Sequence, residues 1–430
     1  MNELGAKIYD QPHILGHFLG YDKLTEDHGK WIKEFWTATK DVWKQAHRGS
    51  FKTTAVTVVG PIWRHLFKAE DRILLSRKTY TNSCDTLEEI AGHYRGPKIK
   101  ELYRKVRGID NFRLRVDRRG RIVLPTKKEP SKEGSIDCAG RDTKVTGSHF
   151  EFLINDDLDT IKDMVSKAER EATRYYRDEQ QNVRNPGGVI GNLGTPWHQQ
   201  DGWHRQNDDG QWEDKPGIIK HPIGTLAIPG FTPEYLLQLK GSMSAPMYAR
   251  NYLLHIIADS ERLFPDPVEA KEWPKRCEGR AYEDPAYKGT HFTAVSVIGF
   301  WEGKYYATGK MWRKDSTTIC EEVAEFISKY NTGTLYVESN ADKGWCAKEM
   351  RKYWPAVMEV NEVENKHIKI LTYAVKNFRL LHWIPETQPE YMAQVLDYRE
   401  GEEPDDAPDS LASLIRAMRI GMRRRLEDRY

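Results

Sequence analysis

The amino-acid sequence predicts a two-domain α/β protein. Its 430 residues exceed the roughly 250–300 at which a single hydrophobic core stops growing. In the N-terminal half, apolar strand-like segments alternate with helical segments, which is typical of a mostly parallel sheet covered by helices. In the C-terminal half, three strand-like segments precede a helix, a further strand and a late helix, which is an RNase H-like order.

The N-terminal domain is expected at residues 1–204. Residues 22–46 are predicted to be helical because Trp31, Phe35 and Trp43 recur at roughly helical spacing. The later elements are predicted in this order: a buried helix at 53–67, a strand at 71–79, a hairpin at 112–125 turning at Arg119-Gly120, a strand at 150–157, a charged helix at 162–184 and a strand at 187–198.

A change in composition marks the end of this domain. Gly, Pro and short helical pieces dominate residues 205–275, which we interpret as a connector with a small helical portion. The second domain is expected at 276–430. Its predicted elements are strands at 280–286, 291–300 and 305–313 with a turn at Glu302-Gly303, a helix at 320–331, a strand at 334–339 and a last helix at 409–418.

Charge and cysteine usage narrow the class of protein. Hydrophobic residues make up 39% and charged residues 30%, which is typical of a folded globular chain. The net charge is only +2, but residues 95–144 carry sixteen Lys/Arg against seven Asp/Glu, which suits either a polyanionic partner or a solvated surface. Five scattered Cys without a CxxC pair favour neither a disulfide framework nor a zinc site and suit a reducing compartment. We find no signal peptide and no apolar run of the roughly 18 residues that a membrane helix needs.

The segment AHRGSFKTT lies where a loop meets the helix at 53–67. A phosphate-binding loop needs exposed amides, a Lys for the β- and γ-phosphates and a hydroxyl for Mg²⁺, and Lys52 and Thr53 meet the last two needs. Ala46 and Phe51 occupy the two usual glycine positions. Lys52 therefore also fits an ordinary surface lysine at the start of a helix.

Two strand ends add to this loop. FEFLINDD brings Asp156 and Asp157 to the carboxyl end of the predicted sheet, where one acid could hold Mg²⁺ through water and the other could orient the attacking water. A solvated turn is the plainer interpretation. In GTPWH, Thr195 follows a strand, where its hydroxyl could sense a γ-phosphate or simply belong to a turn.

A second group of carboxylates lies in the C-terminal domain. Two-metal nucleases gather several carboxylates around a pair of ions. Asp284 and Glu338 each end a predicted strand. The segment PDDAPDSLASLI places Asp405, Asp406 and Asp409 at the start of the last helix, where acids also serve as ordinary helix caps.

Together these motifs resemble the large terminase subunits of tailed bacteriophages, over about residues 25–420. The resemblance rests on the motifs RGSFKTT, INDD and GTPWHQQDGW in the N-terminal half, and on DPA with its FTA strand, an ES pair and DDAPDSLA in the C-terminal half. The resemblance implies an ASCE-type P-loop ATPase domain followed by an RNase H-like nuclease domain. It assigns ATP binding to Arg48, Gly49, Ser50, Lys52, Thr53, Thr54, Asp156 and Thr195, with Arg141 as a candidate arginine finger.

For catalysis the resemblance implies Asp157 in the ATPase site and Asp284, Glu338 and Asp406 in the nuclease site. Asp405 and Asp409 are further candidate metal ligands, and Lys366 and Lys369 are expected to approach DNA phosphates. His291 stands where relatives often carry an acid, which leaves a metal role for that position open.

The implied function is viral DNA packaging. ATP with Mg²⁺ would drive duplex DNA into a procapsid, and Mg²⁺ or Mn²⁺ would support cutting of the concatemer. The implied partners are double-stranded DNA, the capsid portal, the terminase small subunit and a homo-oligomeric ring of copies, in the host cytoplasm and without a membrane. Two alternatives remain: a helicase- or translocase-nuclease of repair or defence, and a DNA-binding adaptor with an inactive ATPase site.

Overall fold

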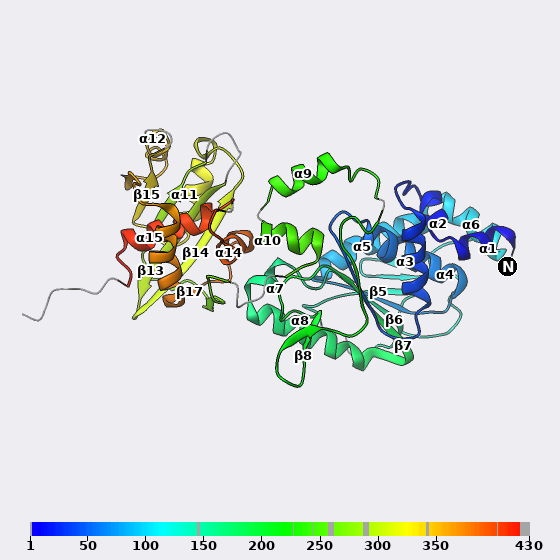
Figure 1. Cartoon of the computed structure of the whole chain (residues 1–430). Helices are drawn as coiled ribbons and strands as arrows, with labels where there is room; N and C mark the ends of the chain where they lie inside the picture. The colour runs from blue at the N-terminus through cyan, green and yellow to red at the C-terminus, as the bar shows by residue number, and fades with distance from the viewer. Residues whose placement is uncertain are drawn as a thin grey trace, which may run out of the picture. The chain divides into compact units, whose positions relative to one another are not determined.

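The computed structural model describes residues 2–143, 147–226, 228–243, 245–256, 262–286, 292–340, 344–401 and 403–421. The chain divides into two compact units (Figure 1). The first comprises Met1–Asp163, Ala168–Lys240 and Tyr248–Ile256, and the second comprises Met164–Lys167, Gly241–Met247 and Ile257–Tyr430. No described helix is long and apolar enough to cross a membrane.

The first unit is built on an eight-stranded sheet in the order β10-β1-β7-β6-β2-β5-β4-β3. The six strands from β10 to β5 are parallel, and β4 and β3 form an antiparallel hairpin at one edge. Their bounds are β1 Val42–Ala46, β2 Ile73–Arg77, β3 Val116–Arg118, β4 Arg121–Val123, β5 Ile136–Gly140, β6 Phe150–Asp156, β7 Arg184–Gly194 and β10 Ile218–His221.

Helices cover both faces of this sheet (Figure 1). On one face the core joins α3, α4, α5 and α6 to the strands, and Trp36 stacks on Phe152 with ring centroids 4.4 Å apart. On the other face Tyr176 of α8 joins a smaller apolar cluster. The bounds are α1 Glu3–Asp10, α2 His13–Leu19, α3 Glu26–Thr37, η1 Thr53–Val59, α4 Gly60–Phe67, α5 Tyr80–Arg95, α6 Pro97–Arg107, α7 Ile161–Val165, α8 Lys167–Glu179 and η2 Gln180–Val183.

The remaining elements before the second sheet are short. They are the hairpin β8 His204–Gln206 and β9 Trp212–Asp214, then α9 Pro233–Gly241, α10 Ala245–Tyr248 and η3 Ala249–Leu253. Strand β10 comes from the range interpreted as a connector, yet it pairs in parallel with β1. The sheet of the first unit therefore extends to His221, beyond the predicted end of the N-terminal domain. The boundaries of the connector stay a prediction.

The fold class that the sequence predicts is confirmed, and two helix predictions are corrected. Residues 22–46 are not helical throughout: α3 ends at Thr37, and Trp43 lies on β1, where pairing with β7 and β10 outweighs the helical spacing. The helix expected at 162–184 is split into α7 and α8, and its last residues form the turn η2 before β7 begins.

The second unit contains a seven-stranded sheet in the order β11-β17-β14-β13-β12-β15-β16. Strands β12, β13 and β14 are antiparallel neighbours, and β15 then pairs in parallel with β12, as the RNase H-like prediction requires. The strand bounds are β11 Val268–Glu269, β12 Gly279–Asp284, β13 Thr293–Trp301, β14 Lys304–Trp312, β15 Thr334–Glu338, β16 Val357–Val360 and β17 Leu381–Trp383.

The two faces of this sheet carry different helices. Ala281, Val295 and Val337 pack with α11 and α12 on one face. On the other face, the Ser296 hydroxyl lies 2.9 Å from Ser410 of α15 and 2.5 Å from Tyr391 of α14. The bounds are η5 Ser316–Thr318, α11 Cys320–Ser328, α12 Trp345–Met350, α13 Lys366–Lys369, η6 Ile370–Val375, η7 Phe378–Leu380, α14 Pro389–Leu396 and α15 Asp406–Ala417.

Candidate active sites

In the first unit, the loop between β1 and η1 has two residues with left-handed backbone. Gly49 has φ 78°, and a Cβ there would lie 2.6 Å from the Phe231 ring. Phe51 also has a positive φ, 54°, although it is not glycine. This backbone conformation costs free energy and persists only where the surrounding structure holds it. Phe51 packs against the core and faces His28, with ring centroids 6.2 Å apart. The loop thus keeps a glycine-like backbone at one of the positions where the usual glycine is missing.

This loop leads Lys52 and Thr53 to the two acids at the end of β6. The Lys52 ammonium lies 3.7 Å from Asp157 Oδ1, and the Thr53 hydroxyl donates a 3.2 Å hydrogen bond to Asp156 Oδ1. Lys52 and Asp156 are both buried. Four residues from segments a hundred positions apart therefore meet at the carboxyl end of the parallel sheet, where α/β sheets bind ligands.

The electrostatics of this cluster fit a divalent cation. Burial, followed by the neighbouring Asp157 carboxylate, raises the pKa of the Asp156 carboxyl to about 6, against the opposing effects of Arg77, Lys52 and the Thr53 hydroxyl. Within the described structure, Ser50 Oγ, Asp156 Oδ2 and Asp157 Oδ1 are buried and have no hydrogen-bond partner. Among the described side chains, the two carboxylate oxygens meet only ion-pair contacts, at 3.4 Å from Arg77 and 3.7 Å from Lys52, and an all-oxygen donor set of this kind matches the preference of Mg²⁺.

Strand β7 lies between the loop strand β1 and the acidic strand β6. Thr195 follows its last residue and is buried. The Asp157 amide donates a 2.9 Å hydrogen bond to the Leu193 carbonyl, so the end of β7 is tied to the acid pair. This is the position that the sequence predicts for a sensor of the nucleotide, and the sensing role stays a prediction.

The two arginines assigned from the sequence are held within this unit. Arg48 lies over the Trp197 ring, with its guanidinium carbon 5.2 Å from the centroid. Arg141 donates to Glu169, 2.8 Å to the carboxylate and 3.1 Å to the backbone carbonyl. Its expected role as an arginine finger in a neighbouring copy stays a prediction.

Sequence reasoning missed Arg77, the last residue of β2. Its Nε lies 3.4 Å from Asp156 Oδ2 and its Nη2 lies 4.0 Å from Asp157 Oδ2. The signal was available, because a charged residue that ends the apolar run ILLS lies at the same sheet edge as the acid pair.

In the second unit, strand alternation separates the acids of β12. Asp284 and Tyr282 share the face that α15 covers, whereas Glu283 lies on the opposite face, 3.4 Å from the Cys346 thiol. Glu338 shares the α15 face because Leu335 and Val337 belong to the core on the other side. Since Glu283 is paired with Val337, Asp284 and Glu338 end neighbouring parallel strands on one face.

Helix α15 brings its own acids to this face. The Ser410 hydroxyl donates a 2.9 Å hydrogen bond to the Tyr282 carbonyl, which fixes the first turn of the helix on β12. Asp406 accepts a 3.3 Å hydrogen bond from the Phe292 amide. Asp405 occupies the N-cap position but makes no capping hydrogen bond through its side chain, so simple capping does not account for it.

Lys366 and Lys369 lie inside this carboxylate cluster. Lys366 contacts Asp405 at 2.8 Å and Asp409 at 3.3 Å, and its side chain is 43% exposed. Lys369 contacts Asp409 at 2.6 Å and Glu362 at 3.0 Å, and its side chain is only 1% exposed. The Lys369 ammonium is buried against protein carboxylates, and its expected contact with a DNA phosphate stays a prediction.

The sequence did not single out Glu362 and Arg416, which extend the cluster. Burial raises the pKa of Glu362, but hydrogen bonds from Arg416 and Lys369 outweigh it and bring the pKa to about 2. Arg416 also contacts Glu364 at 3.1 Å. Both residues come from segments without a motif, so only the tertiary fold shows that they belong to the site.

The central carboxyls resist ionisation. Burial, followed by the nearby Asp409 carboxylate, raises the pKa of Asp284 well above its ordinary range. Burial also raises the pKa of Glu338, with Lys369 acting in the opposite direction. Among the described residues, no three His, Cys, Asp or Glu side chains are arranged to hold a metal ion as they stand. The oxygen donors suit Mg²⁺ or Mn²⁺ chemically, and His291 lies outside the described residues.

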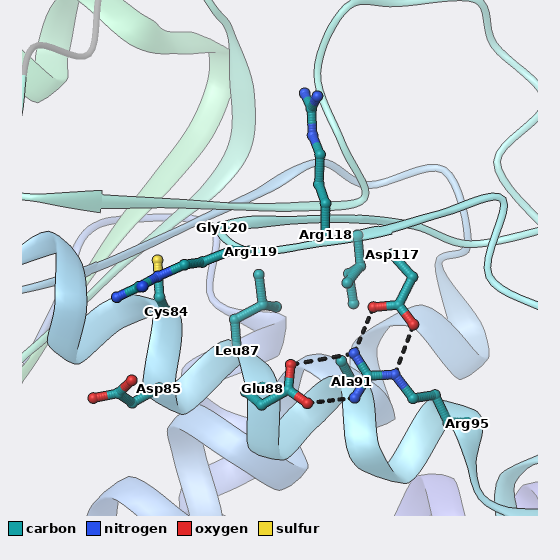
Figure 2. Close-up of a pocket in the computed structure, with 11 residues that line it drawn as sticks. Cys84, Asp85, Leu87, Glu88, Ala91, Arg95, Asp117, Arg118, Arg119 and Gly120 are labelled. Carbon is teal, nitrogen blue, oxygen red and sulfur yellow. Dashed lines mark hydrogen bonds and ion pairs between the residues drawn. The ribbon is translucent and has the colours of Figure 1, made fainter.

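A cavity of about 390 Å³ lies between α5 and the β3–β4 hairpin (Figure 2). At its rim, Arg95 is engaged by Glu88 and by Asp117, 2.6 Å away. Arg118 and Arg119 at the hairpin tip are exposed, and Figure 2 shows Arg118 pointing away from the other lining residues. The tip therefore presents two cations that have no ion pair among the described residues.

No protein-family model matches the chain, and no curated protein matches it. Solved structures of large terminases do match. A large terminase from a thermophilic bacteriophage is 11% identical with a TM-score of 0.37, covering 92% of this chain and 98% of its own. The human cytomegalovirus terminase nuclease domain is 14% identical with a TM-score of 0.29, covering 35% of this chain and 92% of its own. The large terminase nuclease of thermophilic phage G20c is 11% identical with a TM-score of 0.26, covering 34% and 89%.

Proposed function

We propose that this chain is a viral DNA-packaging subunit that hydrolyses ATP in its first unit and cuts DNA in its second. The observation that carries the proposal is the meeting of Lys52 and Thr53 with Asp156 and Asp157 at the end of a parallel sheet. The order of motifs, which resembles that of large terminases, adds the second site. The fold alone would not assign a function.

In the ATPase site, each role follows from chemistry and position. Lys52 binds the β- and γ-phosphates, and the amides of the Gly49-containing loop add donors. Thr53 and Asp156 would hold Mg²⁺, which neutralises charge on the phosphates when it is bound. Asp157, held by its amide at the Leu193 carbonyl, orients the attacking water and accepts its proton.

In the nuclease site, Asp284, Glu338 and Asp406 would hold the divalent metal ions. Such ions activate water and stabilise the leaving oxygen when bound. Asp405 and Asp409 are the nearest further donors. Lys369 keeps Asp409 and Glu362 neutralised inside the protein, and the more exposed Lys366 is the lysine placed to meet a phosphate.

DNA would be held by phosphate contacts without base readout. The exposed arginines at the β3–β4 tip, Arg118 and Arg119, suit this task because no ion pair in the described part of the chain engages them. Some other basic residues of the 95–144 segment are already paired with acids, including Arg95 with Glu88 and Asp117 and Arg121 with Asp137. The assembled partners would be a ring of copies, the capsid portal and the small subunit, in the host cytoplasm.

ATP turnover by the purified chain, with and without duplex DNA, tests the motor half. Wild-type protein is expected to hydrolyse ATP with Mg²⁺, and Lys52→Ala is expected to lose both turnover and nucleotide binding. Lys30→Ala serves as the matched control because that lysine is exposed on α3 and pairs with Asp27. A folded wild-type chain without turnover would favour the DNA-binding adaptor, whereas strand separation of a duplex would favour the helicase-nuclease.

A further inference from the structure

Arg77 meets both acids of the ATPase site although it lies outside every motif that the sequence displays. Strands β2 and β6 pair in parallel up to Ser76 and Asn155, so the next residues, Arg77 and Asp156, lie side by side as the last residues of their strands. The Arg77 guanidinium lies 3.4 Å from Asp156 and 4.0 Å from Asp157. Its placement is therefore set by the register of the central sheet.

Helix α5 holds the other side of the same residue. The Arg77 amide donates a 2.8 Å hydrogen bond to the Ser83 hydroxyl, and Nη1 donates a 3.0 Å hydrogen bond to the Thr86 hydroxyl. Thr86 donates in turn to the Asn82 carbonyl at 3.0 Å, so its hydroxyl is oriented to accept from Arg77. The guanidinium is thus fixed between a helix and the acid pair, and a quarter of the side chain remains exposed.

The chemistry of the arginine side chain also suits this position. Guanidinium stays protonated at every physiological pH and presents several donors in a rigid plane, unlike lysine. Asp157 has φ 49°, and among the described residues its carboxylate forms ion pairs with Lys52 at 3.7 Å and Arg77 at 4.0 Å. Lys52 is committed to phosphate in the proposed ATPase, which leaves Arg77 to orient Asp157 once nucleotide is bound.

We propose that Arg77 is a positioning residue of the ATPase: it holds the Asp157 carboxylate in the orientation that directs the attacking water. The inference rests on the proposed ATP hydrolysis and adds a residue to it. Arg77 acts through Asp157 and belongs to the hydrolysis step, so its loss slows turnover and leaves nucleotide affinity largely intact. Misplacement of a catalytic group by about 1 Å can cost roughly 100-fold in rate.

The test measures kcat for ATP and the equilibrium Kd for ADP in wild type, Arg77→Ala, Arg77→Gln and Arg77→Lys. Arg77→Ala and Arg77→Gln are expected to lower kcat by about 10- to 100-fold while Kd changes by less than about threefold. Arg77→Lys is expected to recover part of kcat, because it keeps the charge and loses the planar donors.

Arg72→Ala is the matched control, because Arg72 precedes the same strand at its other end and pairs with Glu151 and Glu133. It is expected to lower stability and leave kcat per folded molecule unchanged. An unchanged kcat in Arg77→Ala, or a loss confined to Kd, would overturn the inference while the ATPase stands. A wild-type chain without turnover would overturn both.

Discussion

The Lys369 ammonium lies 2.6 Å from the Asp409 carboxylate, and both side chains are at least 95% buried. Removing one partner of a buried pair leaves an uncompensated charge, which typically costs about 3–5 kcal/mol. Lys369→Met should therefore destabilise the second unit by about 3 kcal/mol, since Lys366 still contacts Asp409. Urea unfolding of the full chain measures this change. Lys352→Met, which removes a pair between the exposed Lys352 and Glu349, should leave the free energy of unfolding close to that of wild type. Equal stability of the two variants would contradict the buried role of Lys369.

Asp157→Asn should abolish most ATP turnover while nucleotide still binds. The substitution keeps the size of the side chain and removes the base that accepts the proton of water, so we expect kcat to fall by roughly 100-fold or more. Steady-state turnover and ADP binding measure the two effects. Asp41→Asn is the control, because Asp41 lies before β1 at the opposite end of the sheet and pairs with Arg184. Full turnover by Asp157→Asn would show that another residue is the base.

Arg118 and Arg119 should contribute to DNA affinity by binding phosphates. The double substitution to alanine should weaken duplex binding equally for different sequences. It should also reduce the slope of log K against log salt by about 2, one unit for each phosphate that is no longer neutralised. Fluorescence anisotropy over a salt series measures both. Arg205→Ala, which removes an exposed arginine paired with Glu213, should leave the slope unchanged. An unaltered slope in the double variant would place the DNA elsewhere.

The buried His65 should make the first unit sensitive to acid. Burial shields the ring from water and lowers its pKa from 6.5 to about 4, although the hydrogen bond with the Asp71 carbonyl acts in the opposite direction. The unfolded chain takes up a proton near pH 6.5 and the folded chain only near pH 4. The stability present above pH 6.5 is therefore lost as pH falls from 6.5 towards 4.

Between pH 6.5 and 5 this loss should reach about 1.6 kcal/mol for His65 alone, because the full slope of 1.36 kcal/mol per pH unit is approached only below pH 6.5. Unfolding at a series of pH values, in wild type and in His65→Gln, measures it. The variant is expected to start less stable and to lose less stability on acidification. His221, whose pKa is also lowered to about 4, would account for part of the remaining slope. Parallel curves for the two proteins would refute the assignment to His65.

The sequence predicted the parts of this fold that local pattern encodes. The structure contains the apolar strand that leads to Asp156 and the hairpin that turns at Arg119-Gly120. Both are encoded by neighbouring residues in the sequence, the first by a run of apolar side chains and the second by its turn residues. The helical prediction for Trp43 was wrong because its spacing from Trp31 and Phe35 fits a helix, while strand pairing decided the outcome. Tertiary pairing of this kind leaves little trace in a single sequence.

The residues of the candidate sites also divide into those that a local motif reveals and those that only the tertiary fold reveals. Motifs found Lys52, Asp157 and Asp284, which lie in short segments with typical neighbours. Arg77, Glu362 and Arg416 became visible only when strand register and helix docking brought them to the acids. The burial of Lys369 was equally hidden, because a lysine in a charged segment usually reaches solvent.

Cleavage of supercoiled plasmid with Mg²⁺ or Mn²⁺ tests the central claim most directly, because a plain motor or adaptor has no nuclease. Wild-type protein is expected to nick and linearise the plasmid only with metal, and Asp284→Asn is expected to remove this activity. Glu322→Gln, an exposed acid on α11 paired with Lys314, should cut like wild type. Absence of cleavage by the folded wild-type chain with either metal, or full cleavage by Asp284→Asn, would contradict the account.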